Sequence, residues 1–324
     1  MEKSTFELLE GEKVDSIALL SQVAHMYYDL DMLQPQIAEQ LFFSRSKVSR
    51  ILKRAQELGI VEIKVNRYRS RMSRYEEKLT KLFDLKKAIV MTNFDDVGGE
   101  MAQNDLAACA AQYVSDRLRN ECVLGVACGS TVTRVIHHLS ATKPCTLRVV
   151  QTIGATMDNS MFGASINLAA KTFGGKAYPL NTPLYVEDLY VKQALLNDPS
   201  VKAAYALMKK CNVMLMSIGV FDAQGDMPDW HGYMTQEHRD TLDRLGAVGS
   251  MCAQFFDADG TILHCDWNEK CIAMPWEDIR RSDLCIAVAA GKSKVPSIIG
   301  AIRSGLVDVL ITDTATATHL LRAR

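Results

Sequence analysis

Seven short apolar runs, separated by longer stretches with helical periodicity, constrain the fold of this chain more than any other feature. The runs are KAIVMT, CVLGVA, LRVVQTIGA, KAYPL, VMLMSIGV, LCIAVAAG and VDVLITD. Nearly continuous apolar runs are typical of strands covered on both faces, as in a parallel sheet flanked by helices. Residues 99–119, 160–174, 187–209 and 294–304 have helical periodicity. We therefore predict an α/β domain with a mostly parallel sheet over residues 86–324.

Parallel sheets bind ligands at the carboxyl ends of their strands, so ligand-binding residues are expected directly after the apolar runs. The segment GVACGSTVTRV ends a strand with a glycine and begins a helix, whose free N–H groups attract an anion. Gly129, Ser130 and Thr131 are therefore the first candidate site. The alternative is an ordinary β-to-α turn, because the segment has no lysine and lacks the GxxxxGK spacing. Gly154–Ala155 and Gly219 end two later runs and are further candidates.

The segment AVAAGKSKVPSIIGAIRSG places Lys294 between a strand and a helix. A lysine at such a turn can be a Schiff-base nucleophile, a clamp for a phosphate, or a solvated residue at the end of the helix. The residue pattern alone leaves these three roles open.

A strongly basic segment lies near the N-terminus, although the whole chain has a net charge of -1. Between residues 44 and 74 there are ten lysines and arginines against two glutamates. Such a local positive field attracts a polyanion. Apolar residues at helical spacing predict three helices here, with the stripes Ile17, Leu20, Val23 and Ala24; Ile37, Ala38 and Leu41; and Val48, Ile51, Leu52 and Ala55.

The last two of these helices have the features of a DNA-binding helix-turn-helix. Pro35 suits the first turn of the second helix, and Ser44 suits the N-cap of the third. The alternating IVEIKV after Gly59 predicts a wing, so residues 1–67 are predicted to form a winged helix-turn-helix whose third helix enters the major groove. An amphipathic surface helix with solvated charges is the alternative. The predicted DNA-binding residues are Gln34, Ser44, Arg45, Ser46, Lys47, Ser49, Arg50 and Lys53.

Residues 68–85 form an amphipathic helical segment between the two predicted domains. This helix could be a simple linker or could pair with its copy in another subunit. We favour pairing, because a symmetric operator requires a symmetric protein.

Several other classes of protein are excluded by what the sequence lacks. Its nine cysteines are scattered without a CxxC pair, which indicates buried reduced thiols. The histidines and cysteines show no metal-ligand spacing, and no GxSxG or GxGxxG occurs, so we expect no metal and no cofactor. A charged N-terminus and the absence of an eighteen-residue apolar run predict a cytoplasmic protein without a membrane partner.

These motifs together resemble the SorC family of bacterial sugar-responsive transcription regulators. The resemblance rests on IAEQLFFSRSKVSRILKRAQELGIVEIKV, GGKAYPLNTPLYV, GYMTQEHRDTLDRLGAVGSMCAQFFDADG and AVAAGKSKVPSIIGAIRSGLVDVLITDTATATHLL. It implies a winged helix-turn-helix followed by an effector domain built like the phosphosugar isomerases and deaminases. It also implies a tetramer that binds palindromic operator DNA and responds to a phosphorylated sugar or polyol.

By position, the resemblance places the effector phosphate at Gly129, Ser130 and Thr131, with Gly154 and Ala155 nearby. Lys294 matches the family's effector-contacting lysine. The sequence departs from the family pattern at Ser250, where members often have an acidic residue for effector hydroxyls, and at Ala155, where a second glycine is usual.

The predicted function is therefore regulation of a carbohydrate or polyol catabolic operon, without enzymatic activity. The alternative is a sugar-phosphate isomerase or deaminase that uses Lys294. An isomerase also needs a general base, and Ser250 leaves one expected position without a carboxylate.

Overall fold

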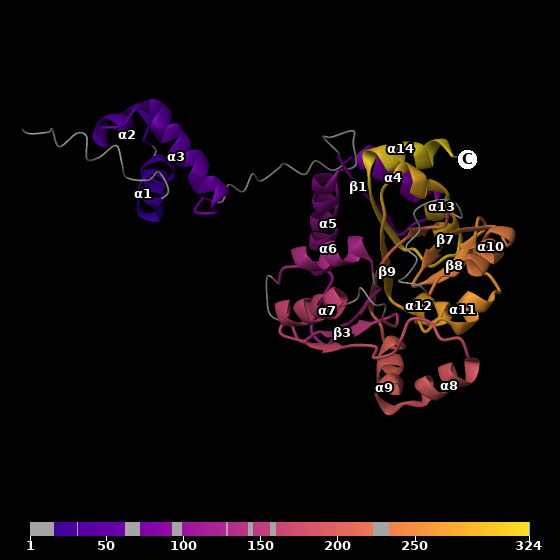
Figure 1. The fold of residues 1–324 in the computed structure, drawn as a ribbon. Coiled ribbons are helices and arrows are strands. Elements are labelled where there is room, and N and C mark those ends of the chain that lie inside the picture. Colours follow the sequence, from indigo (N-terminus) through magenta and orange to yellow (C-terminus); the bar gives the residue numbers. More distant parts are fainter. Residues whose placement is uncertain are drawn as a thin grey trace, which may run out of the picture. The chain divides into compact units, whose positions relative to one another are not determined.

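The computed structural model describes residues 16–30, 32–61, 72–92, 99–127, 129–141, 145–155, 160–222 and 233–323. The chain divides into two compact units, Met1–Tyr68 and Arg69–Arg324 (Figure 1). In the described ranges, no helix has the length and apolar character needed to cross a membrane.

The described part of unit 1 contains three helices around a small core. They are α1 (Ile17–Tyr28), α2 (Gln34–Gln40) and α3 (Arg45–Glu57). The whole stripe predicted for α3 is buried, and α1 and α2 contribute Leu20, Val23, Ala24, Met26, Ile37 and Ala38. The prediction for Ile17 is wrong, because its side chain is 71% exposed. Ile17 is the first residue of α1, and the buried positions begin one turn later at Leu20.

The turn between α2 and α3 contains a residue with an unusual backbone conformation. Phe42 has a φ of 55°, in the left-handed region that favours glycine or asparagine. Its ring is 81% exposed. Two residues later, the Ser44 hydroxyl accepts a hydrogen bond from the Lys47 N–H at 3.2 Å, which confirms the predicted N-cap. Most of the predicted wing, residues 62–65, lies outside the described residues.

Phe42→Asn is expected to stabilise unit 1 by about 0.5–1 kcal/mol, because asparagine adopts the left-handed conformation at lower cost. The exposed phenylalanine ring contributes little packing that the substitution could remove. Differential scanning calorimetry of the full chain would measure the change. Phe43→Asn is the matched control and should destabilise the unit, because Phe43 packs against the core of unit 1. A lower midpoint for Phe42→Asn would contradict the prediction.

Unit 2 is built on a seven-stranded sheet in which every neighbouring pair is parallel. The strand order is β1-β10-β9-β5-β2-β3-β4. The strands are β1 (Lys87–Met91), β2 (Val123–Val126), β3 (Arg148–Gln151), β4 (Lys176–Tyr178), β5 (Val213–Ser217), β9 (Leu284–Val288) and β10 (Val309–Asp313). Each of the seven apolar runs supplies one of these strands, so the prediction of a mostly parallel α/β domain is confirmed.

Helices cover both faces of this sheet (Figure 1). One face packs against α5 (Glu100–Ser115), α6 (Ser130–His138) and α7 (Ser160–Thr172). The other packs against a layer that includes α9 (Pro199–Met208), α12 (Trp276–Arg280), α13 (Val295–Arg303) and α14 (Thr314–Arg322).

The single helical stretch predicted over residues 187–209 is wrong in one respect. It consists of two helices, α8 (Leu189–Asn197) and α9, separated at Asp198. The Asp198 carboxylate accepts hydrogen bonds from the N–H groups of Ser200 and Val201, and Pro199 occupies the first turn of α9. A capping aspartate followed by proline starts a new helix, because proline cannot donate to the preceding turn.

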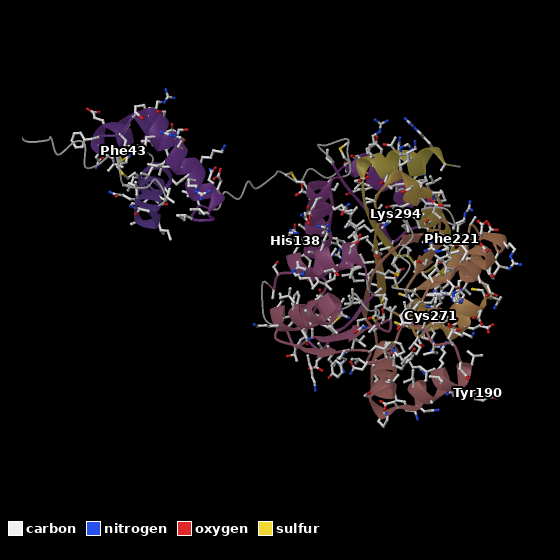
Figure 2. All side chains as sticks on the ribbon, viewed as in Figure 1. Phe43, His138, Tyr190, Phe221, Cys271 and Lys294 are labelled. Carbon is white, nitrogen blue, oxygen red and sulfur yellow. The ribbon has the colours of Figure 1, made fainter. Side chains whose placement is uncertain are left out.

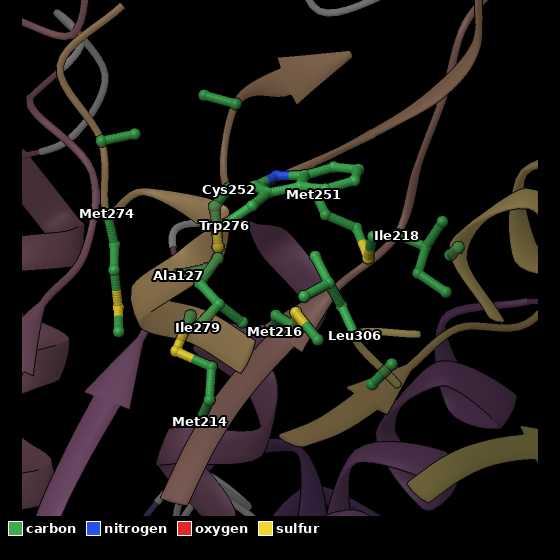
Figure 3. Close-up of a cluster of buried hydrophobic side chains, with 14 of the residues drawn as sticks. Ala127, Met214, Met216, Ile218, Met251, Cys252, Met274, Trp276, Ile279 and Leu306 are labelled. Carbon is green, nitrogen blue, oxygen red and sulfur yellow. The ribbon is translucent and has the colours of Figure 1, made fainter. Parts of the chain in front are cut away.

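A second, smaller sheet lies against α13. It is antiparallel and contains β6 (Gly219–Val220), β7 (Ala247–Met251) and β8 (Gln254–Asp257). The Ser297 hydroxyl of α13 donates to the Val248 carbonyl at 2.6 Å. The side chains of Met216, Ile218 and Met251 belong to one buried cluster between the layers (Figure 3). The small sheet is therefore fixed to the main sheet at the end of β5.

The helix predicted between the domains belongs to unit 2. It is α4 (Ser73–Leu82), and Leu79 on it is fully buried. The Thr80 hydroxyl accepts the Ala88 N–H, and the Glu76 carboxylate accepts the Val90 N–H, both at 3.0 Å. These side chains satisfy backbone groups of β1, which is an edge strand of the sheet. Pairing of α4 with a second copy of the chain stays a prediction.

Candidate functional site

The order of the strands creates a switch point between β2 and β5. From β2 the chain adds β3 and β4 on one side, and then returns to place β5 on the other side of β2. Loops that leave such a pair in opposite directions open a crevice at the carboxyl ends of the strands. The loop after β2 leads to Gly129, and the loop after β5 leads to Gly219.

Gly129 lies at the start of α6 and close to β5. Its φ is 156°, which side chains rarely allow, and a Cβ atom there would lie 2.7 Å from the Ser217 hydroxyl oxygen. The first helical bond of α6 runs from the Thr133 N–H to the Gly129 carbonyl. The N–H groups of Ser130, Thr131 and Val132 have no acceptor in the part of the chain that the structure describes. They can therefore bind an anion at the N-terminus of α6.

The backbone amides of Gly154 and Ala155 are already used. The Gly154 N–H donates to the Ile272 carbonyl at 2.9 Å, and the Ala155 N–H donates to the Thr182 carbonyl at 2.7 Å. A Cβ at Gly154 would lie 2.3 Å from the Pro183 carbonyl oxygen. In this arrangement the two residues can line a ligand site. Neither amide can donate to a phosphate, because each already donates to a backbone carbonyl.

Gly219 and Ser250 are direct partners across the β6–β7 pair. A Cβ at Gly219 would lie 2.6 Å from the Ser250 hydroxyl oxygen. Ser250 is buried. The two residues therefore fit together only while position 219 is a glycine.

Lys294 is labelled in Figure 2 and ends a short 3-10 turn, Lys292–Lys294, that precedes α13. Its ammonium donates to the Ile218 carbonyl at 2.9 Å. The side chain is half-buried, and desolvation lowers the pKa of the ammonium. No carboxylate of the described residues forms an ion pair with it. Of the three roles left open by the sequence, this position excludes the freely solvated one.

Three predicted segments therefore meet on three consecutive residues at the end of β5. Ser217 faces Gly129, the Ile218 carbonyl holds Lys294, and Gly219 faces Ser250. Sequence reasoning missed Ser217 and the Ile218 carbonyl. Ser217 did carry a signal, because it is the polar residue that ends an apolar strand. The Ile218 contact is made by backbone and has no residue-specific signal.

A cavity of about 390 Å³ lies elsewhere in unit 2, between α10 (Gln236–Arg244) and α11 (Asp266–Lys270). Sequence reasoning did not predict it. The Tyr185 hydroxyl donates to Asp266 at 3.0 Å, and Lys270 pairs with the same carboxylate at 2.9 Å. Glu187 and Glu237 also line the cavity. Three carboxylates and one lysine make this lining unfavourable for a phosphate.

The outer surface of α3 presents most of the predicted DNA-binding residues. Arg45, Ser46, Ser49, Arg50 and Lys53 are exposed. The ammonium of Lys47 lies 4.0 Å from the centre of the Phe43 ring, a cation–π contact that holds the side chain in place. The Ser44 hydroxyl accepts the N-cap hydrogen bond of α3. Gln34 is the first residue of α2. The side chains of α3 thus form a basic ridge opposite the buried stripe.

Comparisons with known proteins agree with this architecture. A family model described as "Putative sugar-binding domain" matches residues 69–322. The deoxyribonucleoside regulator of Bacillus subtilis is 30% identical over 304 residues, which are 93% of this chain and 96% of that protein. The sorbitol operon regulator of Klebsiella pneumoniae is 26% identical, over 96% of this chain and 100% of that protein. The crystal structure of full-length SorC from Klebsiella pneumoniae superposes with a TM-score of 0.73 at 25% identity, covering 95% of this chain and 99% of that one.

The parallel sheet, the matching family model and the similarity to known regulators together define a transcription regulator with a sugar-binding domain. The chain belongs to the SorC family of these regulators. The predicted family resemblance is thereby confirmed.

Proposed function

We propose that this chain regulates a carbohydrate or polyol catabolic operon, and that a phosphorylated sugar or polyol controls its affinity for operator DNA. The observation that carries the ligand part is the convergence on Ser217, Ile218 and Gly219. There, three free N–H groups of α6 and one lysine face the switch point of a sheet in a sugar-binding domain.

The phosphate of the ligand binds at the N-terminus of α6. Ser130 and Thr131 supply backbone N–H groups and hydroxyls, and Gly129 lets the phosphate approach the backbone. Gly154, Ala155, Gly219 and Ser250 form the walls around the rest of the ligand, and Lys294 contacts it from the side of α13. When the ligand binds, the Lys294 ammonium leaves the Ile218 carbonyl and bonds to the ligand instead. Occupancy of the site therefore changes a contact at the end of β5.

Unit 1 acts as a winged helix-turn-helix that binds DNA. The N-terminal part of α3, with Arg45, Ser46 and Lys47, lies in the major groove, while Arg50 and Lys53 contact phosphates. A palindromic operator requires two-fold symmetry, which α4 provides by pairing with its copy, and two such pairs form a tetramer. The ligand controls DNA binding by linkage, because it binds the DNA-competent and incompetent tetramers with unequal affinity.

A titration of the full chain against DNA tests this function. We expect a clear preference for a palindromic site from its own operon over random DNA at physiological salt, and a steep loss of affinity as salt rises. A phosphorylated sugar or polyol that raises the melting temperature should also change the affinity for that site. Equal binding to palindromic and random DNA would contradict the proposal.

A second candidate function is catalysis through Lys294, since its lowered pKa favours a nucleophilic amine. No carboxylate or histidine of the described residues contacts this amine to act as a general base. We therefore propose that the chain is not an enzyme. Turnover of a pentose or hexose phosphate by purified protein, abolished in Lys294→Ala, would reverse that conclusion.

A further inference from the structure

We infer that the outer face of α8 is an interface between copies of this chain, at which it packs against α8 of a second copy in an antiparallel, two-fold arrangement. The α8 face consists of Leu189, Tyr190, Val191 and Ala194, which are all exposed. The inference rests on the proposed function in one respect, because the proposed tetramer needs a second interface besides α4.

The α8 face is apolar and accessible. Tyr190 is 87% exposed, the highest value for any large apolar side chain among the described residues, and Leu189 and Val191 are each about half exposed. Tyr190 lies on the outer side of the helix (Figure 2). Adjacent exposed apolar side chains mark interaction surfaces, whereas single ones are common on any protein. Tyrosine is also among the residues that contribute most to binding at interfaces.

The polarity of α8 is the reverse of that of a helix facing water. Lys192 is the one charged residue of this helix, and its ammonium donates inward to the Glu269 carbonyl of α11. The Lys192 side chain is half-buried, and desolvation lowers the pKa of its ammonium. Leu195 and Leu196 pack against the core, but no residue of α8 is fully buried. A helix of nine residues with its charge turned inward and apolar side chains outward suits a surface that another molecule covers.

The charges around the α8 face favour a second copy as the partner. Glu187 and Asp188 directly precede α8, and Lys202 is exposed near the start of α9. A helix of this length spans about 13 Å, so negative and positive side chains lie at opposite ends of the face. The carboxylate between α8 and α9, on Asp198, is engaged in capping α9. When two copies of α8 pack antiparallel, the acidic end of each copy therefore meets the Lys202 end of the other.

The α8 face and α4 lie at opposite ends of unit 2 (Figure 1). The helix α4 packs against β1 and α14, whereas α8 packs against α9 and α11. Both surfaces can therefore be occupied at the same time. Two different two-fold interfaces on each subunit close into a tetramer in which every subunit makes the same contacts. The α8 face thus joins two α4 pairs.

Sedimentation velocity of the full chain over a range of concentrations tests the inference. Tyr190→Asp should dissociate the tetramer into dimers and raise the dissociation constant of that step by roughly 100-fold or more, because it places a charge from each copy in an apolar contact. These dimers should keep normal affinity for a single palindromic site, because α4 pairing is intact. Leu82→Asp changes an exposed residue of α4 and should also give dimers, but with weak binding to that site. The double variant should be monomeric.

Matched variants show whether the effect belongs to the α8 face. Leu168→Asp introduces the same charge at an exposed apolar residue of α7, which covers the other face of the sheet, and should leave the tetramer intact. Lys202→Glu should raise the dissociation constant by about 3- to 10-fold, because two acidic ends then face each other. Lys171→Glu makes the same change on α7 and should have no effect. Circular dichroism identifies folded variants, and Tyr190→Ala serves the same test if Tyr190→Asp does not fold.

The outcomes separate the inference from the proposed function. If Tyr190→Asp keeps the assembly state of the wild type, the inference is overturned and the proposed function stands. The same holds if that variant keeps its assembly state but no longer regulates transcription, because the α8 face then binds a different protein. A wild-type dimer that Tyr190→Asp converts to monomers supports the inference and moves the two-fold contact from α4 to α8. Equal binding of the wild type to palindromic and random DNA overturns the proposed function alone, because the assembly states are measured without DNA.

Discussion

Operator affinity is expected to fall by roughly 100-fold or more in the double variant Arg45→Ala/Lys47→Ala, because each base-contacting side chain contributes about 1–3 kcal/mol. Arg45 is exposed in the first turn of α3, and the contact with Phe43 holds the Lys47 ammonium in place. Neither side chain contributes to the buried core of unit 1. Fluorescence anisotropy with a palindromic site and with random DNA, at several salt concentrations, would measure the loss.

Lys53→Ala is the matched comparison on the same helix. Lys53 is exposed near the middle of α3, where a phosphate contact is expected. Its loss should weaken binding to palindromic and random DNA alike and reduce the salt slope by about one. The double variant should lose mainly its preference for the palindromic site, with the affinity for the phosphorylated ligand unchanged. Full operator binding by the double variant would show that α3 is not the recognition helix.

The strands of unit 2 could be predicted because burial on both faces favours apolar side chains along the whole strand. Runs such as VMLMSIGV are almost continuously apolar, which is typical of short strands that are covered on both faces. The helix boundaries were less certain. Asp198–Pro199 is a clear signal for a new helix, but apolar periodicity continues across it and conceals the break. Ile17 shows a second limit of the apolar periodicity. It continues the apolar stripe of α1 but is exposed, because periodicity does not show where the packing against neighbouring helices ends.

The candidate site could be predicted residue by residue but not as an arrangement. The rule that ligands bind after parallel strands identifies Gly129, Gly219 and Lys294 from local sequence. That these residues meet around Ser217–Gly219 depends on β5 lying between β2 and β9, and strand order is not written in any local pattern. The same limit applies to Gly154 and Ala155, whose amides pair with residues 272 and 182, far away in the sequence.

Ser130→Asp is expected to abolish binding of the phosphorylated ligand, with a loss of roughly 100-fold or more, because a carboxylate would occupy the place of the phosphate and repel it. Ser130 is exposed at the first position of α6, so the substitution displaces no packed side chain. An aspartate in the first turn also stabilises a helix by about 0.3–1 kcal/mol. The variant should therefore melt at the same or a higher temperature without ligand and bind the operator normally.

Ser130→Ala is the matched control for this charge effect. It removes the hydroxyl but keeps the free N–H groups of α6, which make the principal contact in the proposed site. Its affinity for the ligand should fall by about tenfold at most, the value of one neutral hydrogen bond. Titration calorimetry of both variants with one phosphorylated ligand would separate the two effects. If Ser130→Asp binds that ligand as well as Ser130→Ala does, the phosphate does not bind at α6, and Lys294 becomes the only anion-binding group at the switch point among the described residues.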